Sequence, residues 1–158
     1  MSCIYGPHQH GTEDQGWVAH FLIRVLQNKP ITIYGNGRQV RDILHVDDLV
    51  EAFTIAMDNV EKIKGRAFNM GGGTENAISL LEFLDYIAEL HDSLPEVRFA
   101  DWRPGDQVYY VSDTTAFQKA TGWTPKTDKE QGIRHLYESL QERFSSLPHD
   151  PRLEAAAL

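Results

Sequence analysis

The chain has 158 residues, with a hydrophobic share of 41% and a charged share of 24%, ordinary values for a globular domain or part of one. Its formal net charge of -8 argues against a nucleic-acid-binding or membrane-surface protein, although a local cluster of arginines can still bind a small anion. One cysteine, no membrane-length apolar run and no signal-peptide pattern exclude a disulfide framework and predict a cytoplasmic protein that binds neither nucleic acid nor membrane.

No internal repeat or low-complexity linker divides the chain, so residues 1–153 are predicted to form one partial domain. Residues 154–158, EAAAL, have the composition of a vector-encoded tail. Residues 1–6 read as a strand that enters a turn at Gly6-Pro7. A strand with no preceding partner predicts a chain that begins in the middle of a fold.

A polar loop, residues 8–12, comes next and holds two histidines. They could bind a metal ion, but no third ligand follows at a suitable spacing, so we favour a solvated or substrate-facing loop and no metal site. Residues 14–28 are predicted to be a helix with one apolar face. Trp17 on that face is either a core anchor or a residue that borders a ligand, and it can be both. Residues 31–34 form a short strand after Lys29-Pro30.

The stretch from Gly35 to Phe53, GNGRQVRDILHVDDLVEAF, reads as a glycine turn, a strand and a helix. Asp48 and Glu51 have the spacing of a capping box at the start of that helix. An apolar face follows at helical intervals, formed by Leu49, Val50, Phe53 and Met57. Arg41 lies at the edge of this unit, where its guanidinium suits a phosphate, although a surface pair with Asp42 is an equal alternative.

Residues 66–70 are predicted to be a strand that runs into three glycines, residues 71–73. A strand, a glycine run and a helix can indicate a dinucleotide-binding turn, but Asn76 stands where that motif needs its last glycine. Ser79 and Glu82 form a second capping box, which opens another helix.

Residues 97–100 form a short strand, followed by the segment DWRPGD at residues 101–106. Arg103 is suited to a phosphate and Asp106 to ribose hydroxyls, whereas the alternative is an ordinary aspartate-rich Pro-Gly turn. Asp113 is predicted to cap a short helix that stops at Gly122.

The last predicted helix is opened by Thr127 and Glu130, again at capping-box spacing. Its apolar stripe consists of Ile133, Leu136, Leu140 and Phe144. This helix carries no chemistry and is predicted to close the core.

The motif G-x-G-x-Q-x-R-D-x-x-H-V-x-D at residues 35–48 resembles the substrate-binding segment of the extended short-chain dehydrogenase/reductases that epimerise or dehydrate nucleotide sugars. The R-P-G-D at residues 103–106 and the G-W-x-P-K at residues 122–126 are similar to later motifs of that family. The resemblance implies that Arg41 and Arg103 bind the diphosphate of a sugar nucleotide and that Asp106 binds its ribose.

A finer resemblance comes from Y-G-x-x-Q-x-x-x-x-D-Q-G-W-V, read from Tyr5, which is similar to the CDP-paratose (CDP-tyvelose) 2-epimerase branch. It implies a CDP-sugar substrate, and it implies that the strand at residues 31–34 lies along the nucleotide base. The further site residues implied are Gln9, Gln15, Trp17 and Ile33 for the substrate, and Tyr5 and Pro7 for the NAD cofactor.

The family's hydride chemistry needs bound NAD and a Tyr-x-x-x-Lys pair, in which the lysine lowers the pKa of the tyrosine. No tyrosine in this sequence has a lysine four residues later, and the nearest case is Tyr34 with Arg38. The sequence also has no glycine-rich NAD loop. The resemblance therefore implies an α/β fold consisting of the substrate-binding lobe and the last strands of a Rossmann sheet, without the N-terminal half. We expect no catalytic residue in this chain, and NAD bound in the complete enzyme but not by this chain alone.

Two functions follow as hypotheses. The first is the nucleotide-sugar-binding portion of an NAD-dependent nucleoside-diphosphate-sugar epimerase, with a CDP-sugar 2-epimerase favoured over a 4-epimerase or 4,6-dehydratase. The second is a non-catalytic binding or self-assembling module. An unpaired sheet edge invites pairing with a second copy, so a homodimer is the default expectation.

Overall fold

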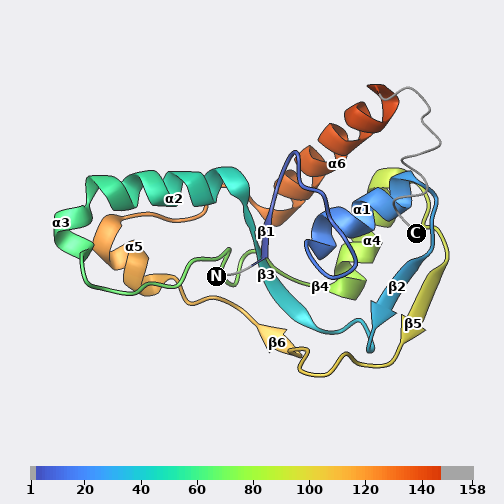
Figure 1. Cartoon of the computed structure of the whole chain (residues 1–158), viewed down its shortest axis with the longest axis horizontal. Coiled ribbons are helices and arrows are strands. Elements are labelled where there is room, and N and C mark those ends of the chain that lie inside the picture. The colour runs from blue at the N-terminus through green and yellow to red at the C-terminus, as the bar shows by residue number, and fades with distance from the viewer. Residues whose placement is uncertain (1–2, 147–158) are drawn as a thin grey trace.

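The computed structural model describes residues 3–146, so the predicted tail at residues 154–158 lies outside the described residues. Helices and strands are interspersed along the chain, as in α/β folds (Figure 1). The strands are β1 (Cys3–Tyr5), β2 (Ile31–Tyr34), β3 (Val40–His45), β4 (Ala77–Ser79), β5 (Val97–Ala100) and β6 (Tyr109–Tyr110). The helices are α1 (Trp17–Leu26), α2 (Val46–Asp58), α3 (Val60–Ile63), α4 (Leu80–His91), α5 (Thr115–Thr121) and α6 (Lys129–Ser146).

Strand β3 organises the sheet. Within residues 3–146, β3 pairs in parallel with β1 through its second half, and with β4 (antiparallel) and β6 (parallel) through its first half. Strands β2 and β5 form a separate parallel pair. Strand β5 is paired with β2, and β6 is paired with β3. The loop between β5 and β6 is therefore held at both ends.

Consecutive residues of β3 serve two hydrophobic cores, because successive side chains of a strand point to opposite faces. Ile43 belongs to the larger core, which α1, α4 and α6 cover. Leu44 belongs to a smaller core under α2 and α5, with Met70, Phe117 and Trp123. Figure 1 shows the corresponding arrangement, with α2, α3 and α5 on one side of β3 and α1, α4 and α6 on the other.

Several predicted elements are confirmed. Helix α1 buries Val18, Phe21 and Leu22 on its apolar face, although its range is shorter than predicted and begins after Gly16. The Ser79–Glu82 capping box opens α4, with both reciprocal hydrogen bonds in place. Helix α6 buries three residues of its predicted stripe, namely Ile133, Leu136 and Leu140.

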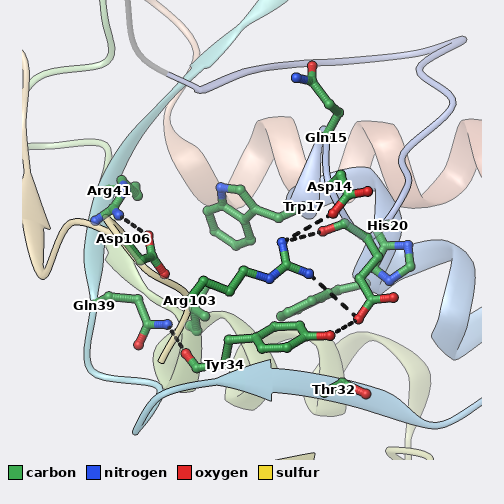
Figure 2. Close-up of a pocket in the computed structure, with 14 residues that line it drawn as sticks. Asp14, Gln15, Trp17, His20, Thr32, Tyr34, Gln39, Arg41, Arg103 and Asp106 are labelled. Carbon is green, nitrogen blue, oxygen red and sulfur yellow. Dashed lines mark hydrogen bonds and ion pairs between the residues drawn. The ribbon is translucent and has the colours of Figure 1, made fainter. Parts of the chain in front are cut away.

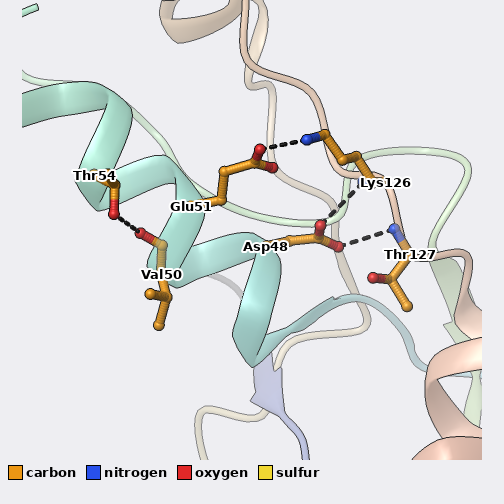
Figure 3. A network of polar contacts seen from close by, with 6 residues as sticks. All are labelled: Asp48, Val50, Glu51, Thr54, Lys126 and Thr127. Carbon is orange, nitrogen blue, oxygen red and sulfur yellow. Dashed lines mark hydrogen bonds and ion pairs between the residues drawn. The ribbon is translucent and has the colours of Figure 1, made fainter. Parts of the chain in front are cut away.

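The predicted capping box at Asp48 and Glu51 is wrong. Helix α2 begins at Val46, and the side chain of His45 caps it by accepting a hydrogen bond from the backbone N–H of Asp47. Asp48 is instead buried in the first turn, where its carboxylate accepts hydrogen bonds from the backbone N–H groups of Lys126 (3.2 Å) and Thr127 (3.0 Å). Figure 3 shows this tie between α2 and the segment before α6, with Glu51 and Lys126 forming an ion pair beside it.

The start of α6 also differs from the prediction. The cap is Asp128, whose carboxylate accepts from the backbone N–H of Gln131 at 2.8 Å, rather than Thr127 with Glu130. At α5, Asp113 accepts from the backbone N–H of Thr115, but Thr114 is the residue that precedes the helix. The predicted stop of α5 at Gly122 is confirmed, since Gly122 has a left-handed conformation with φ of 81°.

Two predictions about apolar segments are wrong. Residues 66–70 form no strand, although Met70 is buried in the smaller core. The apolar face predicted for α2 is largely exposed: the exposed fractions of Val50, Phe53 and Met57 are 56%, 51% and 68%. The face of α2 that packs inward is the one with Leu49, Ala52, Ile55 and Ala56.

None of the helices in the described part of the chain has the length and apolar character that a membrane span needs.

Candidate functional site

A pocket of about 220 Å³ lies between the loop before α1, the first turns of α1, strands β2 and β3, and the loop between β5 and β6. Residues 13–21, residues 32–41, Leu80 and residues 103–106, which are far apart in the sequence, therefore meet at one place (Figure 2). The lining residues are Glu13, Asp14, Gln15, Gly16, Trp17, His20, Phe21, Thr32, Tyr34, Gln39, Arg41, Leu80, Arg103 and Asp106.

Arg41 lines one end of the pocket and is paired with Asp106, not with its neighbour Asp42. Its Nη2 donates to Oδ1 of Asp106 at 2.9 Å, and its Nη1 donates to the backbone carbonyl of Val40. Asp42 points the other way, where it is fully buried and accepts from the backbone N–H of Gly73. The alternative of an Arg41–Asp42 surface pair is therefore wrong, and the guanidinium faces the pocket.

Arg103 reaches across the centre of the pocket (Figure 2). Its guanidinium lies over the ring of Tyr34, 3.8 Å from the ring centroid, in the geometry of a cation–π contact. Its nitrogen atoms lie 3.6 Å from Oε1 of Glu13 and 3.5 Å from Oδ1 of Asp14. The contact with Tyr34, and then the charges of Asp14 and Glu13, raise the pKa of Arg103 above its already high ordinary value, so this side chain is a permanent cation.

The start of α1 is a third feature of this pocket that favours an anion. Gly16, in the left-handed conformation, precedes the helix without a side-chain cap, and the first turn has no acidic residue. The backbone N–H groups of a first turn lack intrahelical acceptors and carry a partial positive charge, which favours anions. Two guanidinium groups and a helix N-terminus thus line the same pocket.

Aromatic and neutral polar groups complete the walls. Trp17 contacts Phe21 and Phe83 edge-on and also lines the pocket, so it is both a core anchor and a site residue. Burial lowers the pKa of His20, helped by the nearby charge of Arg24, which keeps this imidazole neutral at pH 7. The side chain of Gln39 is buried and donates to the backbone carbonyl of Tyr34 at 2.7 Å, which ties β3 to the end of β2.

The structure brings most of the predicted substrate residues together. Those that line the pocket are Gln15, Trp17, Arg41, Arg103 and Asp106. Gln9 is not among the lining residues, because its side chain turns back to donate to the carbonyl of Ile4. Ile33 is fully buried in the core, so only its backbone is left for the base contact that the resemblance implies.

The predicted cofactor residues lie apart from this pocket. The Tyr5 side chain is 2% exposed, and its hydroxyl lies against Gly132 of α6, where an added Cβ would approach it to 2.0 Å. Its ring contacts that of His45 edge-on. A cofactor contact by Tyr5 or Pro7 thus stays a prediction, and for Tyr5 it would have to use the backbone of the turn.

Sequence reasoning missed the partners of Arg103, namely Glu13, Asp14 and Tyr34, and it missed His20 as a lining residue. The pairs join residues that are 90 positions apart for Glu13 and Arg103 and 65 apart for Arg41 and Asp106. No local spacing carries such information. The local signal is the neighbouring polar loop at residues 8–12, for which the sequence predicts a solvated or substrate-facing position.

The glycine run at residues 71–73 was tested as a cradle for a dinucleotide. A Cβ on Gly72 would lie 1.9 Å from the carbonyl oxygen of Ile43, and one on Gly71 would lie 2.3 Å from Asp42 and Ser112. These glycines are needed because the chain packs against itself there, which leaves no room for a pyrophosphate. The described residues thus do not fit an NAD site at this turn. Residues 3–146 also hold no group of three or more His, Cys, Asp or Glu side chains placed to bind a metal ion.

Comparisons with known proteins define the class. Residues 1–71 match the NAD dependent epimerase/dehydratase family. The fold is similar to that of UDP-glucose 4-epimerase from Thermotoga maritima, solved with UDP-glucose, with a TM-score of 0.82 and 30% sequence identity over 90% of this chain and 45% of that chain. The chain is thus similar to part of an epimerase/dehydratase domain of the extended short-chain dehydrogenase/reductase type, and the predicted α/β fold class is confirmed at this level.

Two curated relatives are similar to most of the chain in sequence. The chain is 38% identical over 144 residues to CDP-paratose 2-epimerase of Salmonella typhi, covering 87% of this chain and 42% of the relative. It is 31% identical over 143 residues to dTDP-glucose 4,6-dehydratase of Haemophilus influenzae, covering 82% of this chain and 40% of that protein. The chain therefore spans about two-fifths of the curated relatives it matches, and it is related to the NAD-dependent nucleotide-sugar epimerases and dehydratases as a fragment.

Proposed function

We propose that this chain is the C-terminal, nucleotide-sugar-binding half of an NAD-dependent nucleoside-diphosphate-sugar epimerase, with a CDP-sugar 2-epimerase as the favoured enzyme. The observation that carries the proposal is the convergence of Arg41 and Arg103 on one pocket with the N-terminus of α1. Such an arrangement suits a diphosphate, because a guanidinium can bond two phosphate oxygens at once and helix N–H groups favour anions.

Within this proposal, Arg41 and Arg103 hold the diphosphate and Asp106 accepts hydrogen bonds from the ribose. Strand β2 and Trp17 provide the wall for the base, with Gln15 at the mouth of the pocket. The complete enzyme would bind NAD, which would supply the hydride-transfer chemistry at a sugar carbon. The present chain supplies binding and orientation only, since it has neither the Tyr-x-x-x-Lys pair nor a glycine-rich NAD loop.

The match to a dTDP-glucose 4,6-dehydratase supports an alternative, that the chain is the corresponding piece of a 4,6-dehydratase or 4-epimerase. The same pocket would then bind a different nucleotide sugar. Comparing CDP with UDP and dTDP in one titration series separates these possibilities, because each alternative predicts a different preferred base.

The test is a calorimetric titration of the purified chain with CDP at low salt, with the variants Arg41→Ala and Arg98→Ala. Loss of Arg41 removes charge-assisted hydrogen bonds, so binding should weaken by roughly 1.5–3 kcal/mol. Arg98 is the matched control, because it forms a 2.7 Å ion pair with Glu96 on exposed strand β5 and does not line the pocket. Equal affinities for the wild type and Arg41→Ala would refute the role of Arg41.

A second candidate function, a self-assembling module, is supported by the exposed stripe of α2 and α3, which consists of Val50, Phe53, Met57 and Val60. The spacing of these residues is that of a helix-pairing seam, and exposed apolar stripes of this kind favour association. We propose that the isolated chain forms homodimers through this stripe rather than through a sheet edge.

A further inference from the structure

The loop between β1 and α1 presents two carboxylates to the pocket on a tight turn. Thr12 and Gln15 exchange backbone hydrogen bonds, with N···O distances of 2.8 and 3.3 Å, and Glu13 and Asp14 form the tip between them. Residues at the tip of so short a turn are held in position by the backbone, so their carboxylates reach the pocket without ordering a long loop.

The base of this loop is seated directly on α1. A Cβ on Gly11 would lie 2.2 Å from the backbone nitrogen of His20 and 2.7 Å from the carbonyl oxygen of Gly16, so the loop backbone touches the first turns of the helix. This close approach fixes the distance between the tip and the pocket wall. The backbone of the tip is thus held in place, while the exposed side chains of Glu13 and Asp14 can rotate away from Arg103.

Glu13 and Asp14 hold Arg103 from one side, while Tyr34 holds it from the other. The Glu13 carbonyl accepts a hydrogen bond from Nη1 of Arg103 at 3.2 Å, and both tip carboxylates lie within ion-pair distance of the guanidinium. The hydroxyl of Tyr34 donates to the carboxylate of Glu13. The ring of Tyr34 lies under the guanidinium of Arg103 (Figure 2). Nη1 of Arg103 is therefore hydrogen-bonded by the chain itself, and both of its terminal nitrogens lie beside a tip carboxylate with which a phosphate would have to compete.

We propose that Glu13 and Asp14 form a latch that competes with an anionic ligand for Arg103; this inference rests on the proposed function of the pocket. The two arginines of the pocket face three carboxylates, those of Glu13, Asp14 and Asp106. A dianionic diphosphate gains net attraction there only when the tip carboxylates withdraw from Arg103. Because the side chains of Glu13 and Asp14 are 51% and 88% exposed, each ion pair is weak, and the latch opens readily when a ligand with more charge arrives.

The latch predicts that neutralising two residues of the pocket improves ligand binding, whereas the loss of a pocket contact ordinarily weakens it. The variant Glu13→Gln/Asp14→Asn keeps the size of both side chains and removes their charge. Its matched control is Glu138→Gln/Glu142→Gln, which removes the same two charges from exposed positions of α6 outside the pocket. Calorimetric titration with CDP at low salt should show binding three- to tenfold tighter for the latch variant than for the control.

A second measurement needs no ligand. Hydrogen exchange of the Arg103 guanidinium protons, followed by NMR, should be faster in the latch variant than in the wild type, because the carboxylates beside them have lost their charge, and unchanged in the control. If the wild type binds CDP but the latch variant binds it no more tightly and exchanges no faster, the latch is overturned and the proposed function stands. If neither protein binds CDP at millimolar concentration, the proposed function fails, and the latch fails with it.

Discussion

Asp48 offers the sharpest test of how the two cores are joined. Its buried carboxylate accepts two backbone hydrogen bonds from the segment before α6, at 3.2 Å from Lys126 and 3.0 Å from Thr127 (Figure 3). The variant Asp48→Ala removes both bonds. A hydrogen bond to a charged group contributes about 1.5–3 kcal/mol. Since water can replace the acceptor at exposed Lys126, we expect a total loss of about 2–4 kcal/mol in the free energy of unfolding.

Glu51→Ala is the natural control, because Glu51 pairs with the side chain of the same Lys126. That ion pair joins side chains with exposed fractions of 32% and 70%, so its loss should cost less than about 1 kcal/mol. Urea unfolding followed by circular dichroism measures both variants against the wild type. If Asp48→Ala proves no more destabilising than Glu51→Ala, the buried carboxylate does not tie α2 to α6.

Three further predictions concern α6, the cap of α2 and the exposed stripe. Gly132→Ala should destabilise the fold by about 1–3 kcal/mol in urea unfolding, because the new Cβ would meet the hydroxyl of Tyr5 at 2.0 Å, whereas helix propensity alone would favour alanine. Burial lowers the pKa of His45 in the folded protein. As the pH falls below about 6.5, the unfolded chain therefore binds a proton at His45 before the folded chain does. The free energy of unfolding should then decline between pH 7.5 and 5.5, with a contribution from His45 of up to about 1.4 kcal/mol per pH unit. His45→Asn keeps a capping acceptor without that proton, so a decline as steep as that of the wild type would contradict the assignment. Phe53→Ser/Met57→Ser should abolish concentration-dependent association in sedimentation velocity, and a mass distribution identical to that of the wild type would exclude this stripe as the interface.

Patterns within a short stretch of sequence were sufficient to predict the elements whose contacts lie within one or two helical turns. The Ser79–Glu82 capping box and the apolar stripe of α6 were predicted correctly, because each depends on residues within one or two helical turns. Asp48 had the same spacing with Glu51, yet its carboxylate serves residues 78 and 79 positions away. A capping pattern alone cannot tell whether a tertiary partner will take the side chain.

The apolar residues of α2 show a second limit. Val50, Phe53 and Met57 recur at helical intervals, but the chain buries the neighbouring face with Ala52 against the smaller core. Periodicity identifies a helix with apolar residues, and it does not say which of two apolar faces finds a partner. The described residues cover one of the two faces.

For the candidate site, the sequence predicted the cations but not their partners. Arg41, Arg103 and Asp106 were singled out by motifs, and the structure places all three in one pocket. Their pairing with one another and with the tip of the loop before α1 depends on how β2, β3 and the β5–β6 loop are brought together, which no single motif encodes. The latch was therefore invisible until the fold was known.

The central claim is that this pocket binds the diphosphate of a nucleotide, and an NMR titration of the chain with CDP tests it most directly. The claim predicts saturable shifts of the Trp17 indole, the backbone amides in the first turn of α1, and the guanidinium groups of Arg41 and Arg103. In Arg41→Ala the remaining shifts should need a roughly ten- to hundredfold higher CDP concentration, which corresponds to the loss of about 1.5–3 kcal/mol expected above. Shifts confined to residues outside the pocket, or none at millimolar CDP, would contradict the claim.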